Sequence, residues 1–135
     1  LTSVDSDAVA FARYNRGLVG SYVRALVKER NREHLLKMTA ELVSKTLHAN
    51  QVDNSQLISI LFTATPDITS EFPALAAREL GLGDVPLMCF VEMNVSHALP
   101  RVIRIMVNAE LDIARSQIQH VYLRGATALR QDLAQ

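Results

Sequence analysis

Two charged residues stand inside apolar stretches of this sequence, where a charge needs a partner. Arg104 lies between Ile103 and Ile105 in RVIRIMVNA, and Glu92 stands near the end of VPLMCFVEM. Each requires an opposite charge nearby, because an unpaired buried charge is strongly destabilising. A carboxylate beside a guanidinium accepts hydrogen bonds rather than acting as an acid. The two residues predict either a structural ion pair or a site for a small charged molecule.

Cys89 and Tyr122 are the other candidate site residues. Cys89 shares a predicted strand with Glu92, and Tyr122 follows His120 on a short predicted strand. Strict alternation places Cys89 and Glu92 on opposite faces, so both line one pocket only if the strand bulges or ends there. Taken alone, Cys89 is better explained as a small buried residue than as a nucleophile. Tyr122 alone is better explained as a half-buried tyrosine with a satisfied hydroxyl.

Motifs for covalent, metal and phosphate chemistry do not occur in the sequence. The four histidines show no metal-ligand spacing, and there is neither a Gly-rich phosphate loop nor a GxSxG motif. Arginine, carboxylate, tyrosine and cysteine remain as candidates. Such a set suits binding of a small polyanion and stabilisation of charge, and we expect no cofactor and no metal.

Composition narrows the class of protein. The chain has 135 residues, enough for one domain, and its 14 basic and 14 acidic residues give a formal net charge of zero. A neutral chain has no bulk attraction for nucleic acid or anionic membranes, and no apolar run approaches the roughly 18–20 residues that span a bilayer. The single cysteine fits a reducing compartment such as the cytoplasm. We expect a small-molecule substrate, with neither nucleic acid nor membrane as a partner.

Four stretches predict the strands that must position these residues. Leu57–Thr65 is apolar and β-branched on both faces, which is typical of a strand covered on both sides. The other three are Val85–Met93, Arg101–Ala109 and the shorter, alternating Ile118–Leu123. Arg104, Glu92, Cys89 and Tyr122 all fall on these strands, so the sheet is expected to carry the site.

Two stretches predict helices. Apolar residues recur at helical spacing between Asn31 and Ala49. A short helix from Ala74 to Leu80 has Pro73 in its first turn and Ser70 as a capping residue. The order of elements predicts a mixed α/β (α+β) domain in which helices cover a mixed sheet.

The first thirty residues allow two interpretations. They form either a helix interrupted by Gly17 and Gly20 or a segment with a strand at Gly20–Val27 that completes the sheet. One sequence cannot decide between them. We therefore divide the chain into an N-terminal extension, residues 1–22, and a single domain, residues 23–135.

Four segments carry a resemblance to a known enzyme family. FTATPDITSEFPALAAREL, VPLMCFVEMNV, LPRVIRIM and HVYLRGATALRQDL occur in this order and resemble the trimeric barrel-type (AroH class) chorismate mutases. The resemblance covers most of the chain, and the spacing from Cys89 through Glu92 and Arg104 to Tyr122 follows the family pattern without a gap. It implies a homotrimer whose sheets pack into a pseudo-α/β-barrel, with active sites at the subunit interfaces.

The resemblance also implies an activity and roles for residues. The activity is the Claisen rearrangement of chorismate to prephenate in aromatic amino acid biosynthesis, which needs no cofactor. Arg104 would lie beside the ether oxygen of chorismate, Glu92 would bind the ring hydroxyl, and Cys89 would contribute to the same pocket. The implied substrate-binding residues are Arg78 and Tyr122 near the carboxylates, Phe72, Ala74 and Leu129 as pocket wall, and Arg130 as a further contact.

The N-terminal segment departs from the family pattern. The family opens with a strand close to IRGAT, whose arginine grips a substrate carboxylate. The candidates here are Arg24 in VRAL and Arg16 in NRGL, and Arg24 is preferred because the LVKERN after it resembles the family's run into the first helix. Leu75 also stands where some members carry a lysine, which removes one possible cation.

These departures keep two alternatives open. One is a catalytically degenerate trimer that binds a chorismate-like dicarboxylate without turning it over. The other is an imine deaminase on a related trimeric fold, against which the spacing of Cys89, Glu92 and Arg104 argues. Decay of the ultraviolet absorbance of chorismate discriminates the mutase from the binding protein.

Overall fold

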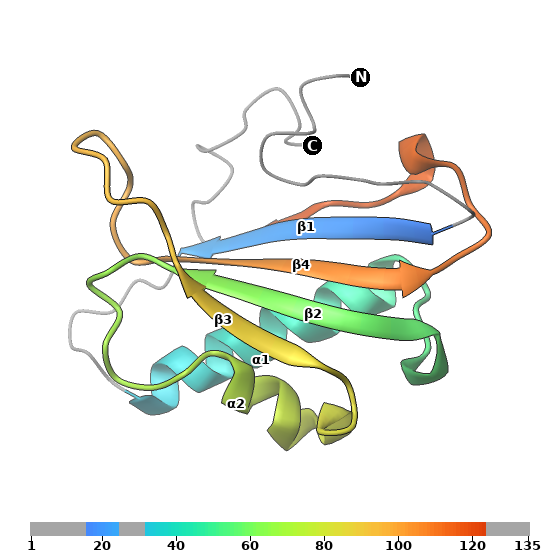
Figure 1. The fold of residues 1–135 in the computed structure, drawn as a ribbon, viewed down its shortest axis with the longest axis horizontal. Coiled ribbons are helices and arrows are strands. Elements are labelled where there is room, and N and C mark those ends of the chain that lie inside the picture. Colours follow the sequence, from blue (N-terminus) through green and yellow to red (C-terminus); the bar gives the residue numbers. More distant parts are fainter. Residues whose placement is uncertain (1–15, 25–31, 124–135) are drawn as a thin grey trace.

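Residues 16–24 and 32–123 are described by the computed structural model (Figure 1). The elements are, in chain order, β1 (Arg16–Arg24), α1 (Arg32–Ala49), β2 (Leu57–Ala64), α2 (Ala74–Ala77), β3 (Leu87–Val91), β4 (Val102–Glu110) and β5 (Val121–Leu123). A wider helical turn, Arg78–Leu82, extends α2. Short turns at Asn54–Gln56 and Arg115–Gln117 lead into β2 and toward β5.

The strands form one mixed sheet in the order β3-β2-β4-β1-β5. β4 is antiparallel to both of its neighbours, whereas the outer strands β3 and β5 run parallel to β2 and β1. Both helices lie against the same side of this sheet (Figure 1). The predicted fold class, a small α+β domain with a helix-covered mixed sheet, is confirmed.

The core lies between the sheet and the helices. On β4, Ile103, Ile105 and Val107 are almost fully buried, as are Leu42 and Val43 on α1. Full burial of each such side chain contributes about 1.5–3 kcal/mol. Because side chains alternate along a strand, the buried residues of β4 place Arg104 on the face away from the helices.

Residues 16–24 of the N-terminal segment form a strand, so the interpretation of this stretch as a helix is wrong. The strand covers Arg16–Arg24 rather than Gly20–Val27, and it lies between β4 and β5. Its pairing with β4 runs without interruption from Arg16 opposite Glu110 to Arg24 opposite Val102. This continuous ladder supports a strand despite the low strand propensity of its two glycines. Residues 16–22 therefore lie in the sheet.

Three local predictions need correction. Ser70 does not cap the short helix. The residue that precedes this helix is Pro73, and no side chain caps its N-terminus. Ile118 was expected to begin the last strand but lies before it, at the end of a tight turn. Its backbone N–H donates to the carbonyl of Arg115. The described helices cover only one face of β2, so Thr63 on the other face is half-buried.

Within the two described ranges, no helix is both long enough and apolar enough to cross a membrane.

Candidate functional site

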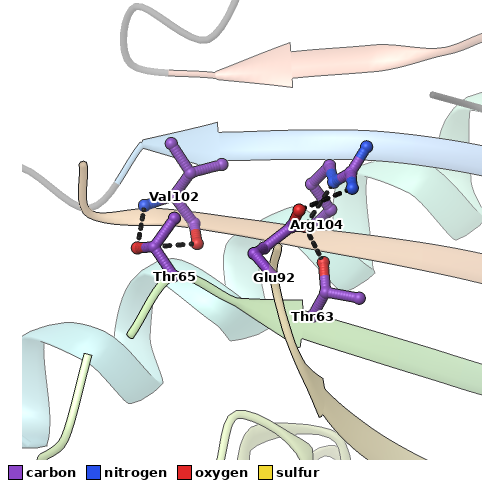
Figure 2. Close-up of polar contacts among 5 residues, drawn as sticks. All are labelled: Thr63, Thr65, Glu92, Val102 and Arg104. Atoms are coloured by element: carbon purple, nitrogen blue, oxygen red, sulfur yellow. Dashed lines mark hydrogen bonds and ion pairs between the residues drawn. The ribbon is translucent and has the colours of Figure 1, made fainter. Parts of the chain in front are cut away.

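Arg104 and Glu92 form an ion pair on the sheet face away from the helices. Arg104 Nη2 donates to Glu92 Oε1 at 2.6 Å, and Arg104 Nε donates to Glu92 Oε2. The side chains are 29% and 14% exposed, so the pair is partly shielded from water but remains accessible. Figure 2 shows both contacts. Two parallel N–H to oxygen bonds fix the relative orientation of the guanidinium and the carboxylate.

The sheet brings these distant residues together through β2. Arg104 on β4 lies opposite Thr63 on β2, and β3 runs along the other edge of β2. Glu92 follows the last residue of β3, and its backbone N–H donates to the carbonyl of Ala64 at 2.9 Å. That bond holds Glu92 beside the end of β2, where its side chain reaches Arg104 and the Thr63 hydroxyl donates to Oε2.

A second set of bonds fastens the end of β2 to the start of β4. The Thr65 hydroxyl accepts the backbone N–H of Val102 at 3.0 Å (Figure 2). The Thr65 N–H donates to the Val102 carbonyl, also at 3.0 Å. Asp67 Oδ1 accepts the N–H of Arg101, a non-glycine residue with a φ of 55°. These contacts fix the turn that leads into β4, two residues before Arg104.

Protonation of Asp67 should weaken this turn. Burial alone would raise the pKa of Asp67, but hydrogen bonds from Thr65 and from backbone amides outweigh it, so the pKa is lowered from 3.8. A lowered native-state pKa means that the stabilisation is complete above about pH 4 and is lost as pH falls through the lower native value. We expect less than about 1 kcal/mol, because solvent screens the carboxylate.

Unfolding of the Asp67→Asn variant measures this effect. Its free energy of unfolding should lie below that of wild type at neutral pH, and the gap should close in acid. A gap that is constant with pH would show that the Asp67 charge makes no contribution.

A groove lies beside the end of β3. Its volume is about 400 Å³, and it is lined by Ala64, Ile68, Thr69, Ser70, Glu71, Phe72, Pro73, Cys89, Phe90 and Val91. Glu71 anchors the loop that forms one wall: Oε1 accepts Arg32 Nε at 2.6 Å, and Oε2 accepts the Phe72 N–H at 3.1 Å. The bond from Arg32 lowers the pKa of Glu71. The groove is largely apolar and holds Phe72 at its rim.

The structure places Cys89 and Glu92 in different surroundings. β3 ends at Val91, one of the two conditions under which both could line one pocket. Cys89, however, lines the groove and lies opposite Phe62, whereas Glu92 is not among the residues of that groove. Within the described residues, Cys89 therefore lines the groove, whereas Glu92 lies beside the groove and does not line it.

The remaining predicted site residues divide into four groups. Phe72 lines the groove and is exposed, and Arg78 is exposed at the start of the turn after α2. Ala74 belongs to the buried core cluster and is not among the residues that line the groove, and its role as pocket wall stays a prediction. Arg24 and Tyr122 are placed only by their backbones, opposite Val102 and Tyr22. Leu129 and Arg130 lie outside the described residues.

Sequence reasoning missed Thr63. Its hydroxyl contacts Glu92 although it looks like an ordinary β-branched strand residue in LFTAT. The available signal was its place as a hydroxyl residue among apolar strand residues. In the part of the chain that the structure describes, no group of three His, Cys, Asp or Glu is placed to hold a metal.

This arrangement can stabilise opposite charges that develop next to each other. A guanidinium and a carboxylate, fixed side by side on a rigid sheet, suit a substrate whose bonds polarise during reaction. Neither needs to exchange a proton or form a covalent bond. The pair is therefore suited to binding a small charged molecule and stabilising charge on it, without covalent or proton-transfer chemistry.

Replacement of Cys89 tests whether a covalent step occurs. The Cys89→Ser variant should keep most of the wild-type kcat, because a site that acts only through fixed charges needs no nucleophile at this position, only a small side chain. Steady-state turnover of the variant is the measurement. Complete loss of turnover in a folded variant would contradict a non-covalent mechanism.

Comparisons with known proteins assign this chain to a family. The family described as chorismate mutase type I matches residues 21–133. Chorismate mutase AroH of Thermus thermophilus is 41% identical over 119 residues, which is 87% of this chain and 95% of that protein. Chorismate mutase AroH of Bacillus subtilis (strain 168) is 37% identical over 120 residues, 88% of this chain and 92% of that protein.

A solved structure agrees with the sequence matches. The chorismate mutase from Clostridium thermocellum superposes with a TM-score of 0.78 at 32% identity, covering 82% of this chain and 97% of that one. The shared fold places the Arg104–Glu92 pair on the sheet of a known enzyme scaffold. By sequence, fold and the extent of the match, this chain belongs to the chorismate mutase type I family.

Proposed function

We propose that this protein catalyses the rearrangement of chorismate to prephenate in aromatic amino acid biosynthesis. The observation that carries the proposal is the Arg104–Glu92 pair, fixed on the exposed side of the sheet in a chain of the chorismate mutase family. The degenerate binding protein is not favoured, because the relatives of this chain are named as chorismate mutases and the charged pair is intact.

Arg104 stabilises the charge that grows on the ether oxygen. The C–O bond breaks while a C–C bond forms, and the transition state carries negative charge on that oxygen and positive character on the ring. A fixed guanidinium binds the more negative oxygen of the transition state more tightly than the ether of the ground state. This difference in binding is what lowers the barrier.

Glu92 acts on the other half of the transition state. Its carboxylate accepts the ring hydroxyl and stabilises the positive character of the ring. Arg104 holds it in place through the two parallel bonds, so little reorganisation is needed during reaction. Cys89 and Phe72 form the nearby apolar wall that excludes water.

Further cations hold the two substrate carboxylates. We assign this role to Arg24, Arg78 and Arg130, with Tyr122 as a hydroxyl donor and Leu129 closing the apolar wall. Such contacts restrict chorismate to the compact conformer in which the reacting carbon atoms meet. Arg24 is favoured over Arg16 because β1 places it opposite Val102, two positions from Arg104 on β4.

We also propose that the protein works as a cytoplasmic homotrimer with its active sites between subunits. β3 is an edge strand of the described sheet, and Val91 and Met93 near its end are 75% and 82% exposed. Phe72, at the rim of the groove, is 69% exposed. An exposed apolar sheet edge is a typical interface, and assembly would also cover the groove. The single cysteine fits a reducing compartment.

A charge at Met93 should prevent this assembly. Burying an unpaired carboxylate in an apolar interface is strongly unfavourable, so Met93→Asp should shift the protein from trimer to its 15.0 kDa monomer and abolish turnover. Sedimentation velocity gives the mass. Leu80→Asp, which changes an exposed apolar residue on the turn after α2 rather than at the end of β3, is the matched control and should stay trimeric. A trimeric Met93→Asp protein would place the interface elsewhere.

The activity itself is tested by the ultraviolet absorbance of chorismate. Addition of the protein should make this absorbance fall at an enzymatic rate, with prephenate as the only product. Binding of chorismate without decay of the signal would overturn the proposed function.

A further inference from the structure

Thr63 is in direct contact with the carboxylate of Glu92. It lies on β2 opposite Arg104, and its hydroxyl donates to Glu92 Oε2, the oxygen that also accepts Arg104 Nε (Figure 2). The hydroxyl is half-buried between two strands. Strand geometry does not require it, because valine has the same branched shape and a high strand propensity. Its contribution is therefore specific to Glu92.

The bonds at Glu92 are distributed unequally between its two oxygens. A carboxylate oxygen offers about two acceptor directions. Oε2 accepts hydrogen bonds from both Thr63 Oγ1 and Arg104 Nε, whereas Oε1 accepts one from Arg104 Nη2. Counting the described residues, Oε2 is saturated and Oε1 keeps one direction for a further donor.

We infer that Thr63 is a positioning residue that makes Oε1 of Glu92 the oxygen that accepts the ring hydroxyl of the substrate. The inference rests on the proposed function. The two bonds from Arg104 orient the carboxylate relative to the guanidinium, but both groups stand at the ends of long side chains with several torsions, so a second anchor is needed to fix the pair relative to the sheet. Thr63, bonding from β2, complements Arg104, bonding from β4. Together they hold the carboxylate at one angle.

Kinetics of Thr63→Val and Thr63→Ser on chorismate give the first test. Thr63→Val should lower kcat on the order of 10- to 100-fold, with KM changed by less than about threefold, because the misplaced carboxylate matters most in the transition state. Thr63→Ser keeps the hydroxyl and should stay within about threefold of wild type. If Thr63→Val fails to fold, Thr63→Ala carries the same test.

A substrate analogue with hydrogen in place of the ring hydroxyl separates positioning from a structural role. For this analogue, the loss of kcat in Thr63→Val should be at least about threefold smaller than the loss on chorismate, because the hydroxyl that Glu92 receives is gone and only the stabilisation of the positive ring remains. A structural defect would slow both substrates equally. Ser59→Ala, which removes a hydroxyl from the same strand away from Glu92, should match wild type on both.

The outcomes distinguish this inference from the proposed function. Equal turnover of chorismate by wild type and Thr63→Val overturns the inference alone, as does an equal loss on the analogue. Absence of turnover by wild type overturns the proposed function and the inference with it. A loss that is larger on the substrate that carries the hydroxyl, with recovery in Thr63→Ser, establishes the role of Thr63.

Discussion

Replacing Arg104 by glutamine lowers kcat on the order of 100- to 1,000-fold, or about 2.7–4 kcal/mol of transition-state stabilisation, the range typical for loss of one electrostatic donor. Glutamine can still donate a hydrogen bond, but it brings no positive charge to the ether oxygen. Arg104→Lys should recover part of the rate, because an ammonium restores the charge without the parallel bonds to Glu92. Steady-state and single-turnover rates with chorismate measure both effects.

The folded state of these variants needs a control, because Arg104 also balances Glu92. Loss of the cation leaves a carboxylate that is only 14% exposed without that partner, which destabilises the native state. Thermal unfolding reports this cost separately from the rate. Arg115→Gln changes an exposed arginine on the turn before β5 and should leave kcat unchanged. A wild-type rate in folded Arg104→Gln would remove Arg104 from the mechanism.

Glu92→Gln is the second substitution with a large expected effect. The amide keeps the size of the side chain but cannot stabilise positive character on the ring, so kcat should fall on the order of 100-fold with a smaller change in KM. Glu92→Asp retains the charge on a shorter side chain and should recover part of the loss. An unchanged kcat in Glu92→Gln would show that the ring needs no anionic partner.

The double variant Arg104→Gln, Glu92→Gln shows whether the two residues act as a unit. Side chains joined by two hydrogen bonds are expected to be non-additive, so the double variant should be little slower than the worse single variant. Its stability should exceed that of Arg104→Gln, because neither remaining side chain carries an uncompensated charge. Strictly additive rate losses would mean that the two residues act on the substrate independently.

The sequence predicted the sheet well because its strands are strongly apolar. Arg104 and Glu92 could be singled out because a charge within an apolar strand needs a partner. The structure pairs them with each other. The N-terminal strand could not be decided from sequence alone. Its two glycines weaken the strand pattern, and pairing with β4, a tertiary contact, supports it.

Other parts of the site depend on geometry that sequence does not reveal. The bond from Thr63 to Glu92 arises because β2 lies between β3 and β4. Ala74 belongs to the buried core cluster, a tertiary contact that its place in the sequence does not reveal, and its role as pocket wall stays a prediction. Ser70 was expected to cap that helix, but the helix begins four residues later, at Ala74.

The proposed mechanism depends most on where the Arg104 guanidinium lies when substrate is bound. A crystal structure of the assembled protein with a dicarboxylate analogue of the transition state measures this position directly. We expect a guanidinium nitrogen at about 2.7–3.2 Å from the ether oxygen, with Glu92 Oε1 accepting the ring hydroxyl. A guanidinium that points away from the ligand, with all its hydrogen bonds made to the protein, would contradict it.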